Sequence, residues 1–71
     1  MTYNISHFMV FITEKIAERF FSCNSVTAYQ VMRKSGFWEF LLETYDVSHT
    51  LSTEYLLKDA AEWFAAKEIA I

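Results

Sequence analysis

The chain contains no proline, and its single glycine, Gly36, lies close to the midpoint of its 71 residues. Proline and glycine are the residues that most often interrupt helices and strands. Apolar side chains recur every three to four positions over most of the sequence, which is the period of an amphipathic helix. The sequence therefore predicts an all-α fold. Gly36 is expected to end a helix, because a residue without Cβ adopts positive φ at little steric cost.

The periodic segments predict a compact bundle of four helices, which forms a single helical domain over residues 1–71. The expected helices span about 5–21, 26–35, 37–45 and 53–68, with connectors at 22–25 and 46–51. The third helix is short and apolar nearly all round, since only Glu39 and Glu43 give it a polar edge. A helix with that pattern is expected to be buried, so we place it at the centre of the bundle.

The same period assigns the buried faces of the second and fourth helices. Val26, Tyr29 and Met32 share one side of segment 26–35, and we expect that side to face the core. Ser52 precedes segment 53–68 and is expected to cap its N-terminus. The core residues expected in that segment are Leu56, Leu57, Ala60, Trp63 and Phe64.

Segment 5–21 carries a second apolar stripe, formed by Val10, Ala17 and Phe21, in addition to its core stripe. The two stripes lie roughly 140° apart around a helix of 3.6 residues per turn. Hydrophobic residues make up 54% of the chain and aromatic residues 18%, and so short a chain buries only about 60% of its unfolded surface. Because an exposed apolar patch commonly marks an association surface, we expect the chain to form a homo-oligomer or to bind a protein partner through Val10, Ala17 and Phe21.

The charge and composition argue against several other classes. The formal net charge is −3, and Arg33–Lys34 is the only adjacent basic pair, so we expect no nucleic-acid binding. The longest uncharged stretch, 1–13, is shorter than the roughly 20 residues of a membrane span and lacks the pattern of a signal peptide. Cys23 is the only cysteine, which together with two histidines is too few for a zinc site. The expected location is the cytoplasm, with no membrane contact, metal or cofactor.

One polar segment has a combination of side chains that indicates a defined role, and it contains Tyr45, Asp46, His49 and Thr50. In a catalytic interpretation, Asp46 orients His49 as a general base. In a structural interpretation, Asp46 accepts amide hydrogen bonds of its own loop, while His49 packs beside Tyr45 and bonds a backbone carbonyl. We favour the structural interpretation, because a small bundle has little volume for a pocket of about 300 Å³ or more. No catalytic residue is therefore expected.

Gly36 stands ahead of the segment Phe-Leu-Leu-Glu-Thr-Tyr-Asp-Val-Ser-His-Thr at 40–50, which Glu-Tyr-Leu-Leu-Lys-Asp-Ala at 54–60 follows. These residues resemble a family of small uncharacterised bacterial proteins known as domain of unknown function 3791. The family pattern is an apolar helix ending in Tyr-Asp, a His-Thr pair three residues on, and a helix that opens near Glu-Tyr. Ala60 and Trp63 depart from that pattern, which has larger aliphatic residues. The resemblance implies genes near those of ADP-ribosyltransferase-like toxins, and hence a partner-binding or antitoxin-like role.

The expected function is a non-enzymatic protein-interaction module that self-associates or binds a protein partner through apolar helical surface. The alternative is a helix-turn-helix transcriptional regulator that uses segments 26–35 and 37–45. Such a regulator needs a basic face, and the second of these segments offers Glu39 and Glu43 instead. A small hydrolase built on Asp46 and His49 is the third hypothesis.

Overall fold

A computed structural model describes residues 5–69, which form helices and no strand. The five helices are α1 (Ile5–Phe20), α2 (Ser25–Ser35), α3 (Phe37–Glu43), α4 (Tyr45–Ser48) and α5 (Thr53–Ala66). The all-α prediction is confirmed. The prediction of four helices is wrong for the described part of the chain, because α4 occupies part of a predicted loop.

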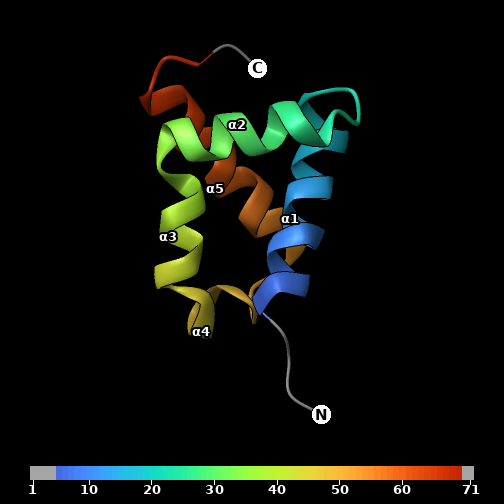
Figure 1. Ribbon diagram of the computed structural model, residues 1–71. Coiled ribbons are helices and arrows are strands. Elements are labelled where there is room, and N and C mark those ends of the chain that lie inside the picture. Colours follow the sequence, from blue (N-terminus) through green and yellow to red (C-terminus); the bar gives the residue numbers. More distant parts are fainter. Residues whose placement is uncertain (1–4, 70–71) are drawn as a thin grey trace.

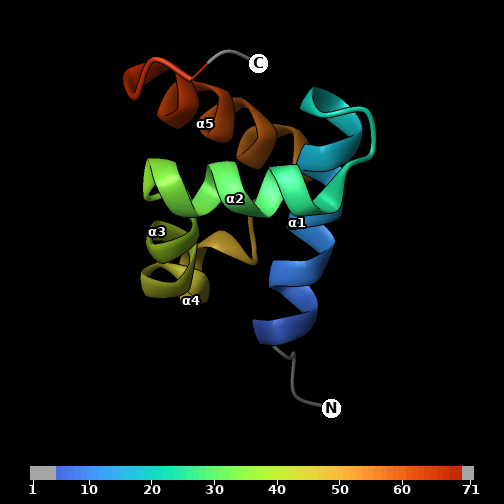
Figure 2. The same cartoon turned by 45° about the horizontal axis from the view of Figure 1, so that its top comes forward.

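The helices are arranged around α2, which lies across one end of the molecule (Figure 1). From the two ends of α2, α1 and α3 run toward the opposite end, where α4 follows α3. The last helix, α5, passes behind α1 and α2, and the turned view shows it alongside α2 (Figure 2). The connection between α4 and α5 therefore crosses the molecule from the α3 side toward α1.

Gly36 forms the whole connection between α2 and α3. Its φ is +87°, in the left-handed region, and its N–H donates to the Arg33 carbonyl at 3.3 Å. Its own carbonyl accepts from the amide of Phe40 at 3.0 Å, so the same residue begins α3. A Cβ at this position would lie 3.4 Å from the Trp63 ring. The helix end predicted at Gly36 is confirmed.

Side-chain caps begin two of the helices. The Ser52 hydroxyl accepts from the amide of Tyr55 at 3.2 Å at the start of α5, as the sequence predicts. At the start of α2, the Asn24 side chain accepts from the amide of Thr27 at 3.0 Å. Each bond satisfies one of the amide groups that the first turn of a helix leaves unpaired.

One hydrophobic core joins the helices. Its fully buried large side chains come from four helices and are Ile12, Ile16, Met32, Phe37, Leu41 and Phe64. Phe64 packs edge-on against both Phe37 and Phe20, with ring centroids 6.2 and 6.0 Å apart. Four of the five predicted core residues of α5 are buried, and the fifth, Trp63, is half-buried.

The predicted central position of α3 is wrong. Phe37 and Leu41 are buried, but Leu42 is 42% exposed and Glu39 and Glu43 face solvent. The backbone of α3 lies closest to α2 and α4, and its aromatic side chains reach rings of α5, whereas α1, α2 and α5 pack on one another. The physical reason is the single-residue turn at Gly36, which holds α3 at the outer end of α2.

The buried face predicted for α2 is also wrong in part. Met32 is fully buried, but Val26 is 66% and Tyr29 38% exposed. The remaining buried positions are Ala28 and Ser35, which are small. The prediction rests on large apolar residues and therefore does not include these small ones. Small side chains at such positions allow two helices to approach closely.

A break in the backbone at Thr44 separates α4 from α3. Thr44 has φ −107° and ψ 17°, and its amide donates to the Phe40 carbonyl at 3.0 Å. The Thr44 hydroxyl donates to the same carbonyl at 2.8 Å. Helical hydrogen bonds then resume, with the amide of His49 donating to the Tyr45 carbonyl. The predicted boundaries, a helix to 45 and a loop from 46, therefore require correction.

Candidate functional site

The predicted polar segment lies at the α4 end of the molecule, and its histidine caps that short helix. The His49 imidazole stacks on the Tyr45 ring, with centroids 4.6 Å apart and planes 20° apart. Its Nδ1 bonds the Tyr45 carbonyl, and since a carbonyl can only accept, Nδ1 carries the hydrogen. Both contacts that the structural interpretation predicts for His49 are made. Thr50 has a similar local contact, because its hydroxyl donates to the Val47 carbonyl at 2.6 Å.

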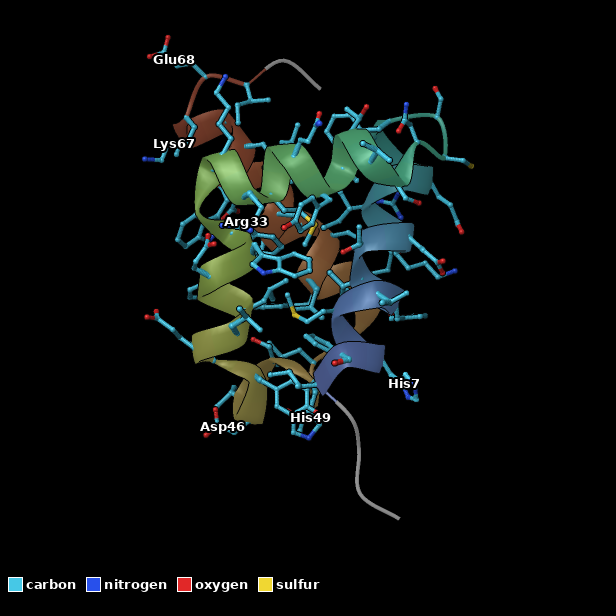
Figure 3. All side chains as sticks on the ribbon, viewed as in Figure 1. His7, Arg33, Asp46, His49, Lys67 and Glu68 are labelled. Atoms are coloured by element: carbon cyan, nitrogen blue, oxygen red, sulfur yellow. The ribbon has the colours of Figure 1, made fainter. Side chains whose placement is uncertain are left out.

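The predicted contacts of Asp46 are not made. Its carboxylate is exposed, and within residues 5–69 it has no hydrogen-bond or ion-pair partner. The amides that a loop aspartate would bond are committed to helical carbonyls, with that of Ser48 on Thr44 and that of His49 on Tyr45. Figure 3 shows Asp46 and His49 on opposite sides of α4. Asp46 therefore does not orient the imidazole, which is the contact that the hydrolase hypothesis requires.

Hydroxyl groups stabilise this segment in place of Asp46. The oxygens of Thr44 and Ser48 are 2.8 Å apart. Because the single Thr44 hydroxyl hydrogen is directed at the Phe40 carbonyl, Ser48 is the donor in this pair. Ser48 is 3% exposed, so the bond satisfies a buried polar group.

The predicted partner-binding stripe of α1 divides between surface and core. Val10 is 57% exposed, whereas Ala17 is only 1% exposed. Phe21 is half-buried and packs against Phe64, with ring centroids 6.2 Å apart. The prediction that Ala17 contacts a partner is therefore wrong. Ala17 lies inside the core, because other helices of the same chain cover that side of α1.

Val10 contributes to a surface that the sequence stripe did not contain. It lines a shallow apolar hollow of about 250 Å³ together with Tyr29 of α2 and Trp38 of α3. The rings of Tyr29 and Trp38 meet edge-on, with centroids 4.8 Å apart. We call Val10, Tyr29 and Trp38 the Val10 face. The three residues come from three helices, so helical spacing within one segment could not group them.

A second hollow, of about 340 Å³, lies where α3 and α4 meet α5. Its apolar lining residues are Phe40, Val47, Leu51, Tyr55 and Leu56, and its carboxylates are those of Glu43, Asp46 and Asp59. We call this set of residues the acidic groove. Burial raises the pKa of the Asp59 carboxyl above its usual value, and the negative charge of Glu62 raises it further.

A third hollow, of about 630 Å³, lies between α1 and α5 and contains charges of both signs. Arg19 donates to Glu54 at 2.8 Å across this hollow. Lys15 is 3.7 Å from Glu18 and lies over the Phe11 ring. Because each of its cations already faces a carboxylate, this open hollow offers no unbalanced charge to a ligand.

A family model described as "Protein of unknown function (DUF3791)" matches residues 7–67. The chain belongs to this family. The resemblance inferred from residues 36–60 is therefore confirmed over most of the sequence. No curated protein and no solved structure matches the chain.

The DUF3791 match contains every residue of the Val10 face and of the acidic groove. It also contains α2 and α3, the pair considered as a helix-turn-helix. In this pair Arg33, labelled in Figure 3, pairs with Glu39 at 2.9 Å and donates to the Tyr29 hydroxyl at 2.7 Å. Both contacts raise the pKa of Arg33. With Glu39 and Glu43 exposed on α3, the geometry does not favour contact with phosphates.

Among residues 5–69, no three His, Cys, Asp or Glu side chains are grouped so that they could hold a metal ion. In the same part of the chain, no helix has the length and apolar character that crossing a membrane requires. Cys23 is exposed in the turn between α1 and α2, where it has φ +67°.

Proposed function

We propose that this DUF3791 chain is a non-enzymatic protein-interaction module that self-associates through the Val10 face. The observation that carries the proposal is the convergence of Val10, Tyr29 and Trp38 from three helices on one apolar hollow. Val10 is 57% and Tyr29 38% exposed, and both side chains are available to a second chain. Aromatic side chains at the centre of a patch are the residues that most often carry binding energy at interfaces.

The charges around the Val10 face favour a second copy of the chain as its occupant. Glu14 lines the hollow, and Arg33 bonds the hydroxyl of Tyr29 beside it. Arg33 is also paired with Glu39. The margin therefore carries charges of both signs, and two copies can be placed with opposite charges facing each other. The acidic groove differs, because two such grooves would bring like charges together.

Sedimentation equilibrium at micromolar concentration tests the proposal. The expected mass is at least twice the chain mass of 8.4 kDa. Val10→Glu places a charge in the hollow and should give the monomer. The matched control is Val47→Glu, since Val47 is 58% exposed and Val10 57%, but Val47 lies in the acidic groove. A monomeric wild-type chain, or equal loss of association in both variants, would contradict the proposal.

A further inference from the structure

We infer that the acidic groove binds a segment of a partner protein in which bulky apolar side chains are flanked by lysine or arginine. The inference concerns a different surface from that proposed for self-association, and it names a partner by its chemistry. It rests on the apolar lining, on the charge at the margin and on the distribution of both over three helices.

The lining of the groove exposes large apolar side chains. Val47 is 58%, Tyr55 57% and Leu51 37% exposed, while Leu56 below them is 3% exposed. These residues come from α4, α5 and the connection between them. The hollow of about 340 Å³ corresponds to about eleven water molecules at roughly 30 Å³ each. An apolar side chain of a partner would displace this water from apolar surface, which favours association.

The margin of the groove carries negative charge that its own chain does not neutralise. Glu43, Asp46 and Asp59 line it, and no lysine or arginine does. Within residues 5–69, none of these carboxylates lies within 4.0 Å of a cationic nitrogen. Lys58 lines the adjacent hollow together with Asp59 and Glu62. Cationic side chains of a partner would therefore meet three carboxylates that have no competing partner.

The Asp59 carboxyl gives independent support for a cationic occupant. Its pKa is raised, first by burial and then by the charge of Glu62. A carboxylate in such surroundings is poorly solvated, and a partner lysine or arginine would favour its charged form. Asp59 lies on α5 and Asp46 on α4, so two of the helices that line the groove each contribute a carboxylate.

The same charges exclude other occupants of the groove. Nucleic-acid phosphates would be repelled by the three carboxylates. A second copy presenting the same groove would oppose carboxylates to carboxylates. An amphipathic segment with basic flanks is complementary to both the apolar lining and the acidic margin. Such a complex would be an example of a helix bound in a groove.

The test uses the full chain and a labelled synthetic peptide of about 16 residues, long enough for partial helicity. The peptide carries leucines at i and i+4 with lysines beside them. One control peptide replaces the lysines with glutamate, and a second replaces the leucines with serine. Fluorescence anisotropy gives the affinity at about 50 and 300 mM salt, which differ in screening length. Amide chemical shifts locate the peptide on the protein.

The leucine–lysine peptide should bind saturably, with shifts at Val47, Leu51, Tyr55 and Asp59, and more weakly at high salt. Both control peptides should bind at least about tenfold more weakly, which corresponds to about 1.4 kcal/mol. Absence of saturable binding up to about 1 mM, equal binding of either control peptide, or shifts centred on the Val10 face would overturn the inference.

Protein variants separate a specific contact from the total charge. Glu43→Gln combined with Asp46→Asn should weaken binding at least about fivefold, because two of the margin charges are lost. The matched control is Glu18→Gln with Glu68→Gln, which removes the same charge from exposed positions outside the groove. Equal weakening in both would overturn the inference. Val10→Glu should bind the peptide as the wild type does, so the failure of self-association and the failure of this inference are distinguishable.

Discussion

Gly36 and Thr44 stand at the two ends of α3, and the helix is interrupted at both by different means. At Gly36 the backbone itself turns, with φ +87°. At Thr44 the φ is −107°, and hydroxyl groups secure the break through the Phe40 carbonyl and Ser48. A joint of the first kind depends on which backbone angles a residue can adopt. A joint of the second kind depends on hydrogen bonds that form only after the neighbouring turns are in place.

Among the variants that test this difference, Gly36→Ala is expected to change the free energy of unfolding most. A side chain at positive φ costs about 1–2 kcal/mol, and the new Cβ would lie 3.4 Å from the Trp63 ring. Urea unfolding followed by circular dichroism should show a loss of about this size in the free energy of unfolding. Gly36→Asn is the control, since asparagine tolerates left-handed angles and should cost less. Equal stability of the alanine variant would contradict a joint that depends on backbone conformation.

A smaller loss, of about 1 kcal/mol, is expected from Thr44→Val, which keeps the shape and removes the hydroxyl. The buried Ser48 hydroxyl then loses the acceptor that lies 2.8 Å away. Thermal unfolding should show a lower midpoint for this variant than for Thr44→Ser, which retains the hydroxyl. Thr50→Val is an exposed control with a single hydroxyl contact and should change the midpoint less. If Thr44→Val and Thr50→Val are alike, the hydroxyls do not secure the joint.

The joints should also differ in their response to pH, because the Thr44 joint borders the acidic groove. The pKa of Asp59 is raised in the folded state, so between 3.8 and that raised value the folded chain binds more protons than the unfolded chain. Its contribution to stability therefore falls as pH rises through this window. Asp59→Asn should match the wild type near pH 3 and gain relative stability near pH 7. The cost of Gly36→Ala should be the same at both pH values, and a pH-independent Asp59→Asn effect would contradict the assignment.

The smallest effect is expected from Asp46→Ala, although Asp46 lies only two residues from the joint. Its carboxylate is exposed and has no partner within residues 5–69. The free energy of unfolding at pH 7 should change by less than about 0.5 kcal/mol. A loss comparable with that of Thr44→Val, measured by the same urea titration, would show that Asp46 also secures the joint.

The helices that the sequence predicts well are those whose ends carry local signals. The boundaries of α1, α2 and α5 agree with the apolar period to within about two residues. Gly36 and Ser52 mark their helix ends through their own backbone or side chain, as predicted. The sequence does not mark the break at Thr44, because a threonine can also lie inside a helix, as Thr13 does in α1, and no glycine or proline accompanies Thr44.

The candidate sites were predictable only where one helical turn determines the contact. His49 on Tyr45 is such a case, since the residues are four apart and the ring caps its own helix. The Val10 face draws on three helices, and the acidic groove on three helices and a connection, so their residues have no common spacing. The prediction for Ala17 is wrong because its burial depends on which helices pack against α1. The sequence of α1 alone does not contain that information.

The single-residue connections at Gly36 and Thr44 also bear on how the chain folds. Helices joined so closely meet as soon as they form, because almost no loop must be closed between them. The packing of α1 against α5 is different, since Arg19 and Glu54, which pair between these helices, are 35 residues apart in the sequence. We expect α2, α3 and α4 to assemble early and the docking of α1 on α5 to complete the folding reaction. Small helical proteins dominated by local contacts fold in roughly microseconds to milliseconds, and this chain is expected to fold in that range.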